Sequence, residues 1–273
     1  MLETIWHRLL RRPYRLHTVR SGNRFGQTVI LLHGIAASSE DWGKVLPYLE
    51  PDYDCITIDL LGFGKSPKPQ SINYTMRDHV LAIEGAIAKL RLGHPYVLIG
   101  HSLGSLVAAR YAMAHSQNIQ RLLLLSPPVY PPIDSIGSRS ARRLTGLLLK
   151  IYKFLHDDPR ITPDSFRKLM YIAPLPRGII RDPETWVPFM RSLRECIEQQ
   201  TISADISRLT IPVDICYGSL DQVVVGYNVE RLGHYQHVTL HQFINTHDLT
   251  KKYGKLIARI MSAPPQKYDA LPR

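Results

Sequence analysis

The sequence predicts an α/β protein built on a mostly parallel, doubly wound sheet, and three observations support this class. Short apolar runs typical of buried strands alternate with segments of helical periodicity along most of the chain. The alternation stops between residues 131 and 206, where only helical patterns occur. The 273 residues, 44% hydrophobic and 21% charged, suit one large globular domain with room for an insertion. We therefore expect an all-helical cap inserted after the strand that ends near Ser126.

The first part of the chain supplies five of the predicted strands. They cover residues 14–19, 28–32, 55–58, 96–99 and 119–126, with helices predicted over 74–92 and from 103 onward. Thr75 and Asp78 have the spacing of a capping box at the start of the first of these helices. Gly62 and Gly64 follow the third strand, but position 67 is proline and the next helix begins only near residue 74. A dinucleotide-binding loop is therefore not expected.

The stretch 131–206 is predicted to lie over the sheet as a cap. Helical periodicity covers residues 141–155, 163–172 and 184–202, separated by turns rich in Asp, Pro and Gly. The candidates for lining a substrate pocket are Leu148, Tyr152, Trp186 and Phe189. The predicted domains are thus a first part of the core at 1–130, the cap at 131–206 and a second part of the core at 207–273.

The alternation resumes with a strand from Val213, then a last strand at 237–241 and a helix at 251–261. Asp221 follows the first of these strands, whereas Asp214 lies inside it. Because chemistry collects at the carboxyl ends of an open parallel sheet, Asp221 is the better functional candidate. His247 follows the last strand and is expected at the same edge. His234, His237 and His241 lack a nearby carboxylate or cysteine, so no metal site is predicted.

The most informative stretch is an apolar strand that ends in Gly100-His101-Ser102-Leu103-Gly104 and turns at once into an Ala-rich helix. Glycines two residues before and after Ser102 let the strand and the helix pass closely. Ser102 is then held in a strained conformation with its hydroxyl pointing out of the sheet. The helix that begins at Leu103 offers unpaired N–H groups to a negative charge. The loop after residues 28–32 places a second candidate donor, the N–H of Ile35, at the same edge.

The net charge of +11 comes mostly from the two ends of the chain. Residues 1–24 and 251–273 supply +10 of it, and no basic stripe, zinc-finger spacing or helix-turn-helix signal accompanies them. Nucleic acid is therefore not an expected partner; the basic ends predict solvated faces or weak attraction to an anionic surface. The apolar residues between positions 2 and 10 have helical spacing. This stretch could dock on a membrane surface, but because 12 residues give little anchoring area we expect it to pack on its own domain or to fray. Residues 263–273, with three prolines, are expected to form a loose tail.

The cysteine pattern and the hydropathy suggest a cytoplasmic location. Cys55, Cys196 and Cys216 are odd in number and far apart, which favours a reduced chain over a disulfide framework. There is no apolar span of 18 residues and no uninterrupted secretory h-region, so stable membrane insertion is not predicted. The sequence leaves both a monomer and a homodimer open.

The order Ser102, Asp221, His247, with a Gly-x-Ser-x-Gly turn and an upstream His-Gly loop, resembles the α/β-hydrolase family and its serine carboxylesterases. The resemblance spans roughly residues 14–262 and is weakest in the cap. It implies that Ser102 is the nucleophile, His247 the base and Asp221 the residue that orients the imidazole. It also implies that Leu103 and Ile35 form the oxyanion hole with their backbone N–H groups.

The resemblance implies hydrolysis of carboxylic esters with small to medium, fairly apolar acyl groups through an acyl-enzyme, without cofactor or metal. Serine at the turn argues against the family's haloalkane dehalogenases and epoxide hydrolases, which use aspartate there. The loop after His33-Gly34 lacks the Ser-Gly-Pro-Gly run of carbon–carbon bond hydrolases, which lowers that alternative but leaves it open. A ligand receptor or signalling protein with an intact triad and little turnover is the remaining alternative.

Overall fold

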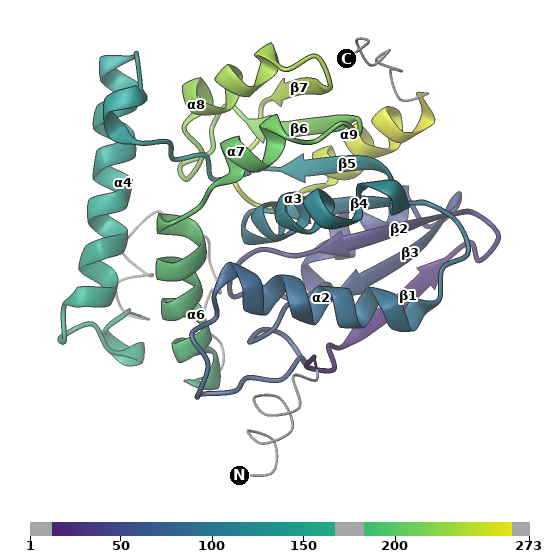
Figure 1. Cartoon of the computed structure of the whole chain (residues 1–273), viewed down its shortest axis with the longest axis horizontal. Coiled ribbons are helices and arrows are strands. Elements are labelled where there is room, and N and C mark those ends of the chain that lie inside the picture. The colour runs from purple at the N-terminus through teal and green to yellow at the C-terminus, as the bar shows by residue number, and fades with distance from the viewer. Residues whose placement is uncertain (1–12, 167–182, 264–273) are drawn as a thin grey trace.

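The computed structural model describes residues 13–166 and 183–263 (Figure 1). Its centre is a seven-stranded sheet in the order β1-β3-β2-β4-β5-β6-β7. The strands are β1 (Thr18–Gly22), β2 (Gln27–Leu32), β3 (Tyr53–Ile58), β4 (Tyr96–His101), β5 (Ile119–Leu125), β6 (Val213–Gly218) and β7 (Val238–Phe243). Only the β1–β3 pair is antiparallel, which confirms the prediction of a mostly parallel sheet.

Helices cover both faces of the sheet, as expected for a doubly wound fold. Because successive strand residues point to opposite faces, the side chains of β2 pack in two separate hydrophobic cores. Ile30 and Leu32 pack with α2 (Met76–Leu90) and α3 (Leu103–His115), whereas Val29 and Leu31 pack with α9 (Lys251–Ser262). The second core also holds Trp42 of a 3₁₀-helix (Ser39–Lys44). Along the chain, α8 (Gly226–Glu230) connects β6 to β7.

Between β5 and β6 the described chain contains helical elements and no strand. They are a 3₁₀-helix (Ile133–Ser135), α4 (Arg139–Asp157), a 3₁₀-helix (Pro183–Thr185), α6 (Trp186–Ser192), a π-helix (Leu193–Glu198) and α7 (Ile202–Ser207). Figure 1 shows α4 and α6 beyond the carboxyl ends of β4 and β5. This segment is the expected cap, and its boundaries at 131 and 206 stay a prediction.

Two predicted elements need correction, and a third lies partly outside the described residues. The first strand covers 18–22 rather than 14–19, because its partner β3 ends at Ile58 and leaves the earlier residues no strand to pair with. The single helix expected over 184–202 is broken, because the backbone of Gln199 and Thr201 leaves the helical region. Of the helix predicted over 163–172, only residues 163–166 are described.

The predicted capping box is confirmed at the start of α2. The backbone N–H of Asp78 donates to Thr75 Oγ1 at 3.2 Å, and the N–H of Thr75 donates to Asp78 Oδ2 at 2.9 Å. The apolar stretch 2–10 and the tail from residue 264 lie outside the described residues. Among the described helices, none has the length and apolar character needed to span a bilayer.

Candidate active site

Ser102 sits between β4 and α3 in a backbone conformation that L-residues rarely adopt. Its φ is 51° and its ψ is −118°. A Cβ on Gly100 would lie 2.3 Å from the carbonyl oxygen of Gly104, and one on Gly104 would lie 2.3 Å from that of Leu32. The two glycines of the motif therefore allow β4, α3 and β2 to approach one another, as the sequence predicts.

His247 lies between Ser102 and Asp221. Its Nε2 is 3.0 Å from Ser102 Oγ, and its Nδ1 is 3.0 and 2.9 Å from the two carboxylate oxygens of Asp221. Because the carboxylate can only accept, Nδ1 carries the proton and Nε2 is left to accept the serine hydroxyl. The structure thus brings together three side chains that are separated by up to 145 residues in the sequence.

Asp221 is held by donors besides His247. Ser126 Oγ donates to Oδ2 at 2.6 Å, and the N–H groups of Val223 and Val224 donate to Oδ1 at 2.9 and 3.0 Å. Burial alone raises the pKa of Asp221, but these bonds and the contact with His247 outweigh it, so the net pKa lies below its ordinary value. Asp221 is therefore held in the ionised form.

His101, the residue before Ser102, braces the loop that carries His247. Its Nε2 lies 2.9 Å from the backbone carbonyl oxygen of His247, so Nε2 is the donor of this bond. Burial and the neighbouring His247 lower the pKa of His101 to about 3. The ring is therefore neutral and keeps the tautomer with the proton on Nε2.

The loop after β2 lies directly against Ser102. A Cβ on Gly34 would be 3.2 Å from the Cβ of Ser102 and 3.2 Å from His101 Nδ1. Among the described residues, none accepts a hydrogen bond from the backbone N–H of Ile35 or of Leu103. Leu103 directly follows Ser102 and Ile35 directly follows Gly34, and the role of their two N–H groups as an oxyanion hole stays a prediction.

Two comparisons with known proteins show which fold this chain has. Residues 27–144 match the family model described as alpha/beta hydrolase fold. The structure also resembles that of haloalkane dehalogenase DbeA from Bradyrhizobium elkani USDA94, with a TM-score of 0.70 at 20% identity over 92% of this chain and 96% of that chain. The chain has the α/β-hydrolase fold.

Curated relatives of this α/β-hydrolase are similar over shorter segments. The chain is 37% identical over 121 residues to the probable lysophospholipase BODYGUARD 4 of Arabidopsis thaliana, covering 43% of this chain and 29% of that protein. It is 33% identical over 103 residues to the 2-hydroxy-6-oxo-6-(2'-aminophenyl)hexa-2,4-dienoic acid hydrolase of Metapseudomonas resinovorans, covering 37% and 35% of the two chains. The chain thus matches well under half the length of either relative.

The predicted pocket residues of the α/β-hydrolase cap lie in packed surroundings. Leu148 is half-buried against the larger core, and the Tyr152 hydroxyl lies 3.1 Å from that of Tyr130. Tyr130 in turn donates to the carbonyl oxygen of Val223 at 2.6 Å, which ties the cap to the segment after Asp221. Trp186 and Phe189 both contact Phe166, with ring centroids 5.5 and 5.4 Å apart. Their part in substrate binding stays a prediction.

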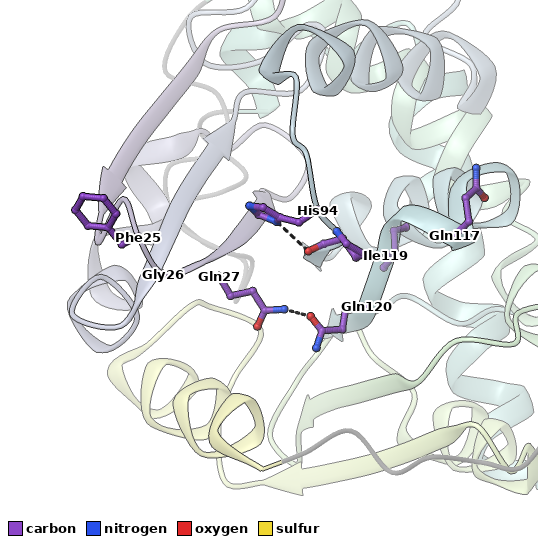
Figure 2. A pocket seen from close by; sticks show the side chains of 8 residues that line it. Phe25, Gly26, Gln27, His94, Gln117, Ile119 and Gln120 are labelled. Atoms are coloured by element: carbon purple, nitrogen blue, oxygen red, sulfur yellow. Dashed lines mark hydrogen bonds between the residues drawn. The ribbon is translucent and has the colours of Figure 1, made fainter.

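A hollow of about 670 Å³ lies at the opposite edge of the sheet from Ser102 (Figure 2). Its lining comes from the amino ends of β2, β4 and β5 and comprises Phe25, Gly26, Gln27, His94, Pro95, Gln117, Ile119 and Gln120. Because ligands of open α/β sheets bind at the carboxyl ends of the strands, this hollow is not the candidate active site of the α/β-hydrolase.

Two of the histidines for which no metal site is predicted have partners distant in the sequence, and one of these partners is a carboxylate. His241 Nε2 is 2.7 Å from Asp214 Oδ1, and His237 Nε2 is 2.9 Å from the carbonyl oxygen of Ile206. Asp214 also binds Arg121 at 2.6 Å, so it belongs to a structural ion pair between strands. Within residues 13–166 and 183–263, no group of three His, Cys, Asp or Glu is placed to hold a metal ion.

Sequence reasoning missed Ser126 and Tyr253, and treated His101 only as part of the motif. Tyr253 OH lies 2.7 Å from Ser126 Oγ, and Ser126 binds Asp221. The only local signal was that Ser126 ends a predicted strand, and therefore reaches the edge of the sheet where Asp221 was expected.

Proposed function

We propose that this α/β-hydrolase cleaves carboxylic esters of small to medium, fairly apolar acyl groups through an acyl-enzyme on Ser102. The observation that carries the proposal is the chain of hydrogen bonds from Ser102 Oγ through His247 to Asp221. This arrangement suits nucleophilic acyl transfer, because the imidazole takes the serine proton while the carboxylate stabilises the resulting imidazolium.

In the proposed acylation, Ser102 Oγ attacks the ester carbonyl carbon as its proton passes to His247 Nε2. The negative charge that develops on the carbonyl oxygen is stabilised by the N–H groups of Leu103 and Ile35, each contributing about 3–4 kcal/mol in typical oxyanion holes. The tetrahedral intermediate then collapses, the C–O bond to the alcohol breaks, and His247 gives its proton to the departing oxygen.

Deacylation repeats these steps with water in place of the serine. His247 takes a proton from water, the hydroxide attacks the acyl carbon, and the acid leaves as Ser102 recovers its proton. Asp221 and His101 serve acylation and deacylation alike, because Asp221 is held in the ionised form and His101 keeps the loop of His247 in place.

The ester class draws support from one relative and from the cap. The relative of Arabidopsis thaliana is named as a probable lysophospholipase, and such an enzyme is an esterase. Apolar and aromatic side chains of the cap, among them Trp186 and Phe189, favour an apolar acyl group.

The test is hydrolysis of p-nitrophenyl esters from acetate to decanoate by the wild type, Ser102→Ala and the control Ser207→Ala on the exposed end of α7. We expect a rate maximum at one chain length, a fall of at least about 10³-fold in Ser102→Ala, and no change in the control. A wild type no faster than Ser102→Ala on every ester would overturn the proposal.

A carbon–carbon bond hydrolase is the second candidate, favoured by the relative of Metapseudomonas resinovorans, whose name describes a dienoic acid hydrolase. A vinylogous 1,5-diketone substrate separates the two candidates, because an esterase leaves it intact. Turnover of the diketone without turnover of the esters would favour this candidate. If neither is turned over but a ligand binds tightly, the receptor alternative is favoured.

A further inference from the structure

One face of α4 carries an apolar stripe that no described element covers. Leu144, Leu147, Ile151 and Phe154 are 44%, 55%, 38% and 50% exposed. They are three or four residues apart, so they follow one face of the helix for almost three turns. Isolated exposed apolar residues are ordinary, but a continuous stripe of four marks an interaction surface.

The helix cannot turn this stripe inward, because its opposite side is fastened to the protein. Thr145 Oγ1 accepts a hydrogen bond from Asn228 Nδ2 at 3.0 Å, and the Tyr152 hydroxyl lies 3.1 Å from that of Tyr130. Ala141 and Leu155 are buried on the same side. In Figure 1, α4 stands at the margin of the molecule, beyond the carboxyl ends of the strands.

Positive charge borders the stripe. The helix holds five Lys or Arg residues and only one acid, Asp157, which is already paired with Lys153. Arg143 and Lys150 are exposed, and among the described residues neither has an ion-pair partner. Each lies four residues before a stripe residue, Leu147 and Phe154, so charge and apolar surface are side by side.

We propose that α4 lies flat on an anionic lipid surface, with the stripe in the acyl boundary and the basic residues among the headgroups. An amphipathic helix with Leu and Phe on one face and Lys or Arg beside it has the composition that binds membrane interfaces. The charge selects lipid over a neutral apolar partner, because juxtamembrane Lys and Arg are attracted to acidic headgroups. The helix is too polar to span the bilayer, so it rests on the surface.

The experiment is co-sedimentation of the full chain with vesicles of phosphatidylcholine alone or with about 30% phosphatidylserine, the anionic lipid that attracts basic segments. Two variants are compared with the wild type, the apolar pair Leu147→Ser/Phe154→Ser and the charge pair Arg143→Gln/Lys150→Gln. Leu81→Ser is the matched control, because Leu81 is 45% exposed but lies on α2. Circular dichroism verifies that each variant is folded.

We expect the wild type to bind the anionic vesicles, more weakly as salt rises, and each double variant to bind at least about tenfold more weakly. The control should bind like the wild type. The proposal is overturned if the wild type does not bind, or if both variants bind as well as the wild type, which would assign binding to the basic ends. It is also overturned if light scattering shows a dimer that Leu147→Ser/Phe154→Ser dissociates while vesicles are not bound. Vesicle binding needs no turnover, so this result is independent of the proposed ester hydrolysis.

Discussion

Ser126 Oγ donates a hydrogen bond of 2.6 Å to Oδ2 of Asp221, across the carboxyl ends of the adjacent strands β5 and β6. The single proton of Ser126 is engaged in this bond, so Tyr253 is the donor in its 2.7 Å contact with Ser126. Helix α9 on the far face of the sheet therefore supports the carboxylate that binds His247.

We expect Ser126→Ala to lower kcat/KM for the preferred p-nitrophenyl ester by roughly tenfold. A hydrogen bond to a charged group contributes about 1.5–3 kcal/mol, and the carboxylate that loses this donor orients His247 less well. Tyr253→Phe keeps the bond from Ser126 to Asp221, so its effect should be smaller. Steady-state kinetics of both variants test this, and equal rates for Ser126→Ala and the wild type would contradict the assigned support.

The backbone conformation of Ser102 predicts that Ser102→Gly is more stable than Ser102→Ala. A residue with a Cβ at φ 51° and ψ −118° carries about 1–3 kcal/mol of strain that glycine relieves. Both variants should be inactive on esters. Urea unfolding measures the difference, which we expect to be about 1 kcal/mol or more.

Ser105, three residues further along α3, is the matched control for this prediction. At a helical position glycine is about 1 kcal/mol less favourable than alanine. Ser105→Gly should therefore be less stable than Ser105→Ala, the reverse of the order expected at residue 102. The same order at both positions would show that the strain at residue 102 is not relieved by glycine.

The close approach of Gly34 to Ser102 predicts that Gly34→Ala impairs turnover. Its added Cβ would be 3.2 Å from Ser102 Cβ and from His101 Nδ1, so the loop that carries the N–H of Ile35 and these two side chains have to shift apart by a few tenths of an ångström. We expect kcat/KM to fall at least about tenfold, because a misplaced oxyanion donor costs about 3 kcal/mol. Gly43→Ala is the control, since nothing lies within 4 Å of its Cβ. Unchanged kcat/KM in Gly34→Ala would contradict a role for this loop.

The buried His79 predicts loss of stability in weak acid. Its Nε2 lies 3.0 Å from Ser192 Oγ between α2 and α6, and burial lowers its pKa from 6.5 to about 4. Below pH 6.5 the unfolded chain therefore takes up a proton that the folded chain does not, and the free energy of unfolding falls. Between pH 8 and pH 5 this amounts to about 2 kcal/mol.

Urea unfolding of the wild type and His79→Gln at both pH values isolates this contribution. The wild type should lose about 2 kcal/mol more than the variant on going from pH 8 to pH 5. If the wild type and His79→Gln lose the same free energy of unfolding, His79 has the same pKa in the folded and the unfolded chain, which would contradict the prediction. His33 and His101 are present in both proteins, so their own titration cancels in the comparison.

The sheet and the candidate triad could be predicted because their signals are local. An apolar run marks each central strand, and Gly100 and Gly104 mark the turn at Ser102, since only glycine fits where the backbones cross. Asp221 and His247 follow from their places after predicted strands. The span of β1 could not be predicted, because the end of its partner β3 decides where pairing begins.

Contacts between strand ends and the packing of the cap depend on the folded chain. That Ser126 binds Asp221 requires β5 and β6 to be neighbours, which strand patterns alone do not reveal. Periodicity places Leu147 and Leu148 on one helix, but it does not tell which of them is covered. Leu148 packs against the core, whereas Leu147 is 55% exposed.

The three side chains that meet at Ser102 are made at different times during synthesis. The turn with Ser102 and the strands β2, β4 and β5 leave the ribosome before the cap, and His247 follows only after β6 and β7. Until then Ser102 Oγ has no imidazole beside it and is an ordinary alcohol. A nascent chain that stalls before its last strand is thus expected to be inert toward serine-directed reagents, and reactivity should appear only when β7 joins the sheet.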